Sequence, residues 1–332
     1  MDEKKDLLVV ENLTMEFESV KRFLEKRIPN VKAVNNVSFV VKEGETFGLV
    51  GESGCGKTTL GKCIVRLLEP TSGKLLFNDE GEWKDLLQLK KKESFELRKK
   101  LQIVFQDPYA ALNPQHTILE AFDEPMRVHG IGGGDKEERK KLIAEALLRV
   151  NLQPDYMYRY PHEFSGGQRQ RICVAKALVL QPKMIICDEP VSALDVSVQA
   201  QLLNLMKRLQ KELGVTYIFI AHDLSVVQYM SDRIGVMYLG NMVELADSDE
   251  LYNKPLHPYT EALLSAVPVP KVNAKKERII LQGDVPSPMD PPSGCPFHPR
   301  CAKCMEICKQ KKPELIQKDQ AHFVACHLYN EQ

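Results

Sequence analysis

The sequence lacks the features that mark several large protein classes. None of its apolar runs is long enough to span a bilayer, and its 45 basic residues are balanced by 45 acidic ones. A protein whose main partner is nucleic acid usually has a basic excess, so that class is disfavoured. The charged N-terminus has no apolar signal-peptide region. We therefore expect a cytosolic protein that meets a membrane only through a partner.

Two other patterns are missing: an internal repeat, and the C-x₂-C…C-x₂-C pair of a common zinc ribbon. The chain has 332 residues, 43% hydrophobic and 27% charged, which is ordinary for a globular protein of two or three domains. Of its nine cysteines, five lie between Cys295 and Cys326, and in a cytosolic chain such a cluster indicates a metal before a disulfide. The others are expected to pack as small hydrophobic groups: Cys55, Cys63, Cys173 and Cys187.

The most informative segment runs from Gly51 to Thr58 and fits G-x-x-x-x-G-K-[ST] at every fixed position. Residues 46–50 read as a buried strand and residues 59–65 as the start of a helix, which is the context that this phosphate-binding motif requires. Its backbone N–H groups can point inward as anion donors, Lys57 can neutralise the β- and γ-phosphates of a nucleotide, and Thr58 can hold Mg²⁺. The nucleotide-binding residues predicted here are Gly51, Ser53, Gly54, Cys55, Gly56, Lys57, Thr58 and Thr59.

A second segment supplies two carboxylates. Residues 183–187 are mostly apolar and end in Asp188 and Glu189, which is typical of a buried parallel strand that opens onto a site. We expect Asp188 to lie near the Mg²⁺ and Glu189 to polarise the attacking water as a general base.

A third segment opens another helix with glycines. Residues 165–168 read Ser-Gly-Gly-Gln and lead into a stretch with one apolar helical face. A helix start of this kind presents N–H groups to an anion, so a second phosphate contact is predicted, made by Ser165, Gly166, Gly167 and Gln168. With both helix starts in one chain, the sequence resembles the ATP-binding cassette (ABC) ATPases. In that family the signature loop of one subunit closes over the ATP of another, which implies a second ATPase subunit.

Further residues match the same family in chain order. The resemblance implies that Gln106 senses the γ-phosphate, contributes to the Mg²⁺ site and faces a membrane subunit. It implies that His222 contacts the γ-phosphate and that Asp195 belongs to a loop that crosses the dimer interface. Phe17 resembles the aromatic residue that stacks on adenine. No catalytic position departs from the family pattern, so Glu189, His222 and Gln106 are the predicted catalytic residues.

The organisation of the chain follows from the same resemblance. Residues 1–268 are interpreted as an α/β domain, an ABC-type P-loop ATPase core with a mainly parallel sheet plus antiparallel strands. Residues 93–178 are mostly helical in pattern and match the family's helical subdomain. Residues 7–50 read as short strands, with an insert at residues 18–32 that is a brief helix or a hairpin arm. Only one cassette is present, so a working site needs a second chain.

The end of the chain reads differently. Residues 269–294 form a linker too rich in proline for regular structure, and residues 295–332 form a small cysteine-rich extension. A segment this short cannot build much core, so a metal or docking must order it. Thiolates suit zinc and iron–sulfur clusters alike.

Here the resemblance narrows to the oligopeptide/dipeptide importer branch of the ABC ATPases. It is carried by residues 256–263 (LHPYTEAL), by the linker and by residues 294–301 (GCPFHPRC). The resemblance implies a [4Fe-4S] cluster, with Cys304 extra to the ligand pattern. Zinc, helped by His298 or His327, and reduced thiols without metal are the alternatives. The ligands that the resemblance implies are Cys295, Cys301, Cys308 and Cys326.

The predicted function is ATP hydrolysis that powers import of di- or oligopeptides from the cytoplasmic face of the cell membrane. The resemblance implies two transmembrane permease subunits and, indirectly, an extracytoplasmic substrate-binding protein. Residues 109–114 (YAALNP) resemble one of two paired ATPase types, which points to a heterodimer. Alternatives are an importer of nickel or oligosaccharide, a soluble ABC ATPase acting on DNA or ribosomes, and a regulator with a redox-sensing tail.

Overall fold

A computed structural model describes residues 4–18, 30–267, 278–319 and 321–330. The chain divides into two compact units. Unit 1 contains Gln88–Ile220 together with Lys42–Glu45 and the N-terminal residues up to Lys5. Unit 2 contains the segments Asp6–Val41 and Thr46–Leu87 and everything from Ala221 onward. Each unit is described by itself.

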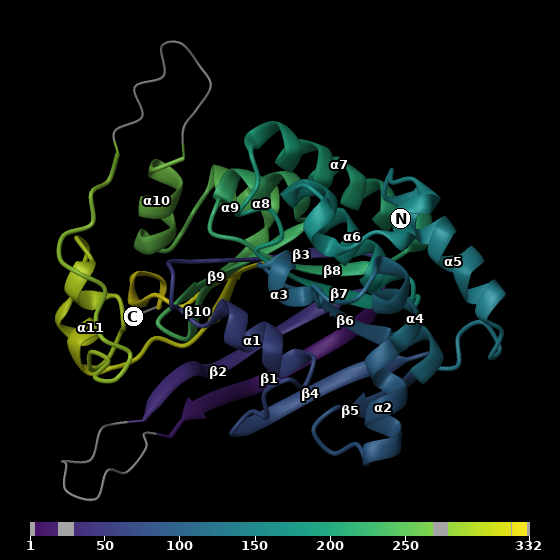
Figure 1. Cartoon of the computed structure of the whole chain (residues 1–332). Coiled ribbons are helices and arrows are strands. Elements are labelled where there is room, and N and C mark those ends of the chain that lie inside the picture. Colours follow the sequence, from purple (N-terminus) through teal and green to yellow (C-terminus); the bar gives the residue numbers. More distant parts are fainter. Residues whose placement is uncertain (1–3, 19–29, 268–277, 320, 331–332) are drawn as a thin grey trace, which may run out of the picture. The chain divides into compact units, whose positions relative to one another are not determined.

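Unit 2 contains a four-stranded sheet of order β2-β1-β4-β5, seen at the bottom of Figure 1. β1 and β4 pair antiparallel, with Leu8 opposite Phe77 and Val10 opposite Leu75. Apolar side chains alternate along β1, so one face is buried and the other is half-exposed. The four strands are β1 Asp6–Phe17, β2 Val31–Lys42, β4 Ser72–Asp79 and β5 Glu82–Asp85.

Unit 2 also contains the strand that precedes the phosphate-binding motif. β3 runs parallel to β9, and the order continues antiparallel through β10 and β12 to β11. All five residues of β3 are buried, as its continuous apolar sequence predicts. The last two strands come from the cysteine-rich extension, which is therefore docked on this sheet. The strands are β3 Thr46–Val50, β9 Arg233–Tyr238, β10 Asn241–Asp247, β11 Ile316–Asp319 and β12 His322–Val324.

Unit 1 is built on three parallel strands in the order β6-β7-β8. β7, the middle strand, is fully buried and ends at Asp188. Its helices include α6, which packs against α3, α5 and α7. The strands of unit 1 are β6 Leu101–Val104, β7 Met184–Asp188 and β8 Thr216–Ile220. Its helices are α2 Lys91–Lys100, α3 Pro108–Ala111, α4 Ile118–Val128, α5 Lys136–Arg149, α6 Gly166–Leu178 and α7 Val196–Leu213, with 3₁₀ turns η1 Pro154–Tyr158 and η2 Pro161–Glu163.

The described helices of unit 2 have five to eight residues each. They are α1 Lys57–Ile64, α8 Leu224–Met230, α9 Ser248–Asn253, α10 Pro258–Ser265 and α11 Glu306–Gln310, with 3₁₀ turns η3 His298–Arg300 and η4 His327–Tyr329. Within the described parts of the chain, no helix combines the length and apolar character that a membrane crossing needs.

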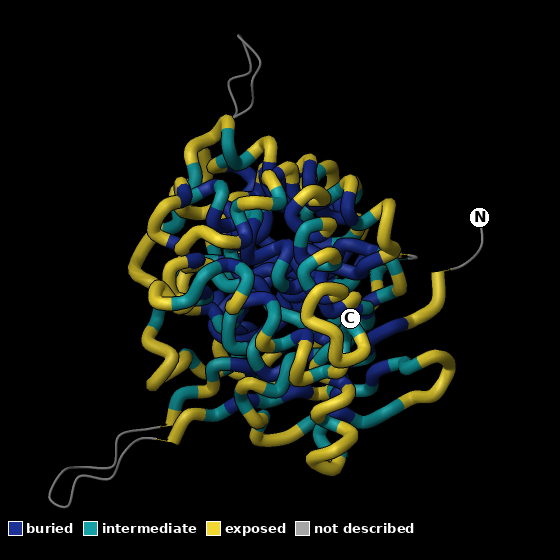
Figure 2. The backbone as a smooth tube through the Cα atoms, turned by 45° about the vertical axis from the view of Figure 1, so that its right-hand side comes forward, coloured by how far each residue is buried: buried dark blue, intermediate teal, exposed yellow. Residues whose placement is uncertain are grey.

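The buried residues, dark blue in Figure 2, include leucines of the helices and strands together with β-branched and aromatic side chains of the strands. Among the largest fully buried side chains are Tyr217 and Phe219 of β8 in unit 1, and Phe47 and Tyr238 in unit 2. The predicted site residues follow the C-terminal ends of the buried strands in the sequence, so these strands position them.

The predicted α/β fold with parallel and antiparallel strands is confirmed. One detail was wrong: β1 and β2 are not short, because each has 12 residues. The polar residues between their apolar positions occupy the outward positions of a half-exposed sheet, so they do not end the strands. The insert expected at residues 18–32 falls almost entirely on residues 19–29, outside the described residues. Residues 278–294 of the predicted linker contain no helix or strand.

Candidate active site

The glycines of the phosphate-binding motif are required by space as well as by conformation. α1 begins directly after Gly56, which has φ +103°. A Cβ atom on Gly56 would lie 2.0 Å from the carbonyl oxygen of Ala33, and one on Gly51 would lie 2.2 Å from that of Met237. Only glycine therefore fits at these two positions. The predicted strand–loop–helix context is confirmed.

Lys57 is buried and bound by its own loop. Its ammonium group donates hydrogen bonds to the carbonyl oxygens of Gly51 at 2.7 Å and Glu52 at 3.0 Å, and lies 3.6 Å from the Cys55 sulfur. Burial raises the pKa of the Cys55 thiol, although the charge of Lys57 acts in the opposite direction. The loop thus holds a cation among backbone groups at a helix start, which is an arrangement suited to a polyphosphate.

In unit 1, the carboxylate of Glu189 lies beside Gln106, the predicted γ-phosphate sensor. Asp188 is buried at the end of β7, and Glu189 follows with φ +47°, a conformation that is uncommon outside glycine. The Gln106 amide donates a hydrogen bond of 3.0 Å to the Glu189 carboxylate. Strained backbone of this kind persists where the surroundings hold it, often at functional sites.

The predicted signature segment caps α6. The Ser165 hydroxyl accepts a hydrogen bond from the Gln168 N–H, and the Ser165 N–H donates to the Gln168 side chain at 2.9 Å. A Cβ atom on Gly167 would lie 2.4 Å from the side chain of Val198, so α7 packs closely against this turn. Asp195 stands at the N-cap of α7.

Two further predicted residues, outside the phosphate-binding loop, lie in unit 2. Phe17 is the last residue of β1 and is 41% exposed, so its ring is accessible. His222 is exposed in the loop before α8. Among the predicted residues, the structure shows a hydrogen bond between Gln106 and Glu189 in unit 1 and another between Lys57 and Gly51 in unit 2.

Sequence reasoning missed a contact beside the signature. The Arg169 guanidinium lies over the Tyr109 ring at 3.8 Å from its centroid and donates hydrogen bonds to the Tyr109 hydroxyl and to the carbonyl oxygen of Pro161. This contact joins α6 to the segment that follows Gln106, within unit 1. The signal was present in the sequence, because an arginine on the buried face of a helix needs a partner.

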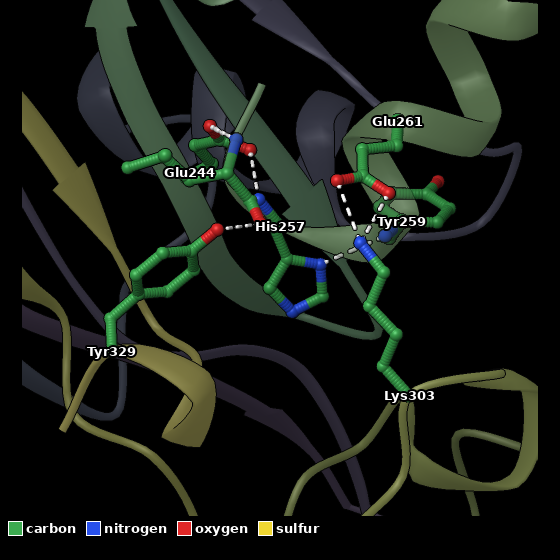
Figure 3. Close-up of polar contacts among 7 residues, drawn as sticks. Glu244, His257, Tyr259, Glu261, Lys303 and Tyr329 are labelled. Atoms are coloured by element: carbon green, nitrogen blue, oxygen red, sulfur yellow. Dashed lines mark hydrogen bonds and ion pairs between the residues drawn. The ribbon is translucent and has the colours of Figure 1, made fainter. Parts of the chain in front are cut away.

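The cysteine-rich extension is docked through a buried acid. Glu244 of β10 accepts hydrogen bonds from the N–H groups of Leu256 at 2.6 Å and His257 at 3.0 Å, and its carboxylate lies 2.7 Å from His322 Nε2 of β12. Figure 3 shows Glu244 beside the backbone of His257, and also the ion pair of Lys303 with Glu261. From the sequence, we expect a metal or docking to order the extension. In the described residues, the extension is docked through these contacts.

Two of the four predicted cysteine ligands have a strongly raised pKa. Burial, and then the neighbouring thiols, raise the pKa of Cys295 and of Cys326 to about 11. Cys301 and Cys308 are among the neighbours that contribute in both cases. In the parts of the chain that the structure describes, no group of three or more His, Cys, Asp or Glu is placed to hold one metal ion.

Comparison with known proteins decides the family. The family model "ABC transporter" matches residues 34–192, and the model "Oligopeptide/dipeptide transporter, C-terminal region" matches residues 243–308. The oligopeptide transport ATP-binding protein AppF of Bacillus subtilis (strain 168) is 51% identical over 325 residues, which cover 95% of this chain and 97% of AppF. The oligopeptide transport ATP-binding protein OppF of Haemophilus influenzae is 49% identical over 327 residues, which cover 97% of this chain and 97% of OppF.

The chain belongs to the ATP-binding proteins of the oligopeptide/dipeptide ABC transporter family. A solved dimeric ABC transporter cassette, MJ0796, agrees with this assignment: it is 30% identical, has a TM-score of 0.63, and the match covers 73% of this chain and 99% of the cassette. The predicted family and the prediction of an ATP-hydrolysing ABC ATPase subunit are confirmed.

Proposed function

We propose that this ABC ATPase powers the import of di- and oligopeptides, working peripherally at the cytoplasmic face of the cell membrane. The observation that carries the proposal is the presence in one chain of the ABC match and the oligopeptide/dipeptide C-terminal match. Two permease subunits and an extracytoplasmic binding protein are the partners that this implies. Residues 109–114 (YAALNP) favour a second, non-identical ATPase subunit.

The reaction is hydrolysis of the γ-phosphoryl group of ATP. Lys57 and the N–H groups of its loop bind the β- and γ-phosphates, and Phe17 stacks on the adenine. Glu189 accepts a proton from the attacking water, whose oxygen bonds to the γ-phosphorus as the bond to the ADP oxygen breaks. His222 positions the γ-phosphate. The other predicted loop residues, Ser53, Gly54, Cys55 and Thr59, surround the phosphates.

Mg²⁺ would be held by Thr58, Gln106 and Asp188, whose hydroxyl, amide and carboxylate oxygens are the hard ligands that this ion prefers. When bound, it would neutralise charge that develops on the phosphate oxygens. What supports this set is its donor chemistry, together with the burial of Asp188.

Gln106 has a second part in the proposal, because its amide is bonded to Glu189. A base that accepts this hydrogen bond is oriented by it, and the resemblance assigns Gln106 to the surface that faces the membrane subunit. Movement of that surface would therefore change the orientation of the base. The signature residues, Ser165, Gly166, Gly167 and Gln168, and Asp195 act at the ATP of the second subunit.

Transport tests the function directly. In cells that lack this gene, uptake of a labelled oligopeptide should be lost and should return with the wild-type chain. It should not return with Glu189→Gln. Loss of nickel or oligosaccharide uptake with intact peptide uptake would overturn the cargo assignment.

We also propose a [4Fe-4S] cluster on Cys295, Cys301, Cys308 and Cys326. What supports it is that the Cys301 and Cys308 thiols lie near enough to contribute to the raised pKa of both Cys295 and Cys326, in a segment too small to have its own core. A bound cluster would supply a four-point covalent link between distant parts of the tail.

Metal analysis tests the cluster. Iron and sulfide should be present after anaerobic purification and lost in Cys301→Ser, whereas the control Cys304→Ser should keep both. Zinc in place of iron would overturn the cluster assignment, and so would retention of iron in Cys301→Ser.

A further inference from the structure

The extension reaches the phosphate-binding loop through an arginine. Arg300, at the end of η3, forms two hydrogen bonds with the Glu52 carboxylate, from Nη1 at 2.8 Å and from Nη2 at 3.2 Å. The Arg300 side chain is only 8% exposed. These residues are 248 positions apart in the sequence, and both lie in unit 2. A bidentate pair of this kind fixes the orientation of the carboxylate as well as compensating its charge.

Glu52 is the first variable residue of the loop, and it is held at three points. Its N–H donates to the Tyr259 hydroxyl at 2.9 Å, and its carbonyl oxygen accepts from the Lys57 ammonium at 3.0 Å. Its carboxylate is bound by Arg300. Any shift of Glu52 therefore moves a carbonyl group that holds Lys57.

An aromatic cluster packs beside this pair and the loop. Tyr259 of α10 packs against Tyr238 of β9 and against Phe297, with ring centroids 4.7 and 5.4 Å apart. Phe297 immediately precedes η3. The segment Val285–Pro288 also reaches the loop, because it lines a cavity of about 250 Å³ together with Glu52–Cys55, Tyr238 and Leu239.

The negative charge of Glu52 is unexpected in a loop that binds phosphate groups. The loop binds a polyphosphate, and a carboxylate within it would repel that ligand. Because Arg300 is buried and paired, it offsets this charge without offering a competing exposed cation. Charges a few ångströms apart near a protein surface interact strongly enough for this compensation to change the affinity for a polyphosphate.

We propose that Arg300 is a positioning residue of the nucleotide site: it neutralises and orients Glu52, and so makes the affinity for Mg-ATP depend on the docked extension. The inference rests on ATP binding at this loop. It assigns the extension a role in nucleotide binding that does not require the cluster to react.

A charge cycle tests the proposal. The probe is the fluorescent analogue MANT-ATP with Mg²⁺, bound to the purified full chain at low and high salt. Arg300→Gln should weaken binding on the order of tenfold, because it leaves Glu52 unpaired. Glu52→Gln should bind within about threefold of wild type, and the double variant should return to that level. The loss in Arg300→Gln should shrink at high salt, because salt screens the repulsion.

Lys303→Gln is the matched control. It breaks a surface ion pair between the extension and the rest of unit 2, to Glu261 at 2.9 Å, and does not touch the loop. It should leave MANT-ATP binding unchanged. Arg300→Lys keeps the charge and should bind more tightly than Arg300→Gln, which provides a test if the latter folds poorly.

Two results would overturn the proposal. One is unchanged binding in Arg300→Gln. The other is a double variant as weak as Arg300→Gln, because the unpaired charge would then not be the cause. Failure of the wild-type chain itself to bind MANT-ATP would instead overturn the ATPase assignment.

Discussion

Glu244→Gln should undock the extension more than any change at its surface. Glu244 is fully buried and accepts three hydrogen bonds, from Leu256, His257 and His322. Glutamine has the same shape, but its amide NH₂ would face one of these donors. One donor is then unsatisfied, at about 1–3 kcal/mol, and the other two bonds lose the charge that strengthens them, at about 1 kcal/mol each. We expect a total of about 3–5 kcal/mol.

Hydrogen exchange of the β12 amides is the right assay, because a chain with two units does not unfold in a single step. Their opening free energy should fall by about 3–5 kcal/mol in Glu244→Gln. In Lys303→Gln it should change by less than about 1 kcal/mol, because that pair is exposed. A change below about 1 kcal/mol in Glu244→Gln would refute the reasoning about buried donors.

The same pair gives the docking a pH dependence. Burial lowers the pKa of His322, but the hydrogen bonds and charges of Glu244 and Glu250 outweigh it and raise the pKa above its usual value. The stabilisation is therefore complete below about pH 6.5 and is lost as the pH rises through the raised pKa. Protection of the β12 amides should decrease from pH 6 to pH 9 in the wild type and should not follow this trend in His322→Gln.

The remaining predictions concern the nucleotide site. Glu189→Gln should bind ATP but hydrolyse it at least about 10²-fold more slowly, and near-normal turnover would remove Glu189 from the role of base. Gly56→Ala should abolish MANT-ATP binding, because its Cβ would lie 2.0 Å from a backbone oxygen. Gly54→Ala, also at positive φ but with nothing within 4 Å, should cost only about 1–2 kcal/mol of stability and keep binding; equal loss in both would contradict the steric argument.

The parts of the site that sequence could predict are those written in consecutive residues. The strand, loop and helix around Lys57 were found because strand burial, glycine spacing and helix start all lie between residues 46 and 65. The acidic end of β7 and the cap at Ser165 have the same local character. The roles of His222, Phe17 and the cysteines came from resemblance and stay predictions.

Contacts between distant residues were out of reach for a physical reason. Nothing near Glu52 in the sequence indicates that its partner lies 248 residues later. Likewise, the short segment His322–Val324 reads as tail, and it becomes a strand because β10 offers an unpaired edge and Glu244 a buried acceptor. Charge pairs and added strands depend on which surfaces meet, and one sequence contains no record of that.

These contacts give the extension a physical connection to ATP binding. Docking rests on Glu244 of β10, which pairs antiparallel with β9, and β9 contributes Tyr238 to the aromatic cluster beside the loop. From the other side, η3 contributes Arg300 to Glu52. A change that loosens the tail therefore acts on the loop by two routes, through packing and through charge. If the packing route dominates, Glu244→Gln will weaken MANT-ATP binding equally at low and high salt. If the charge route dominates, the weakening will be salt-dependent and will disappear when Glu52→Gln is added.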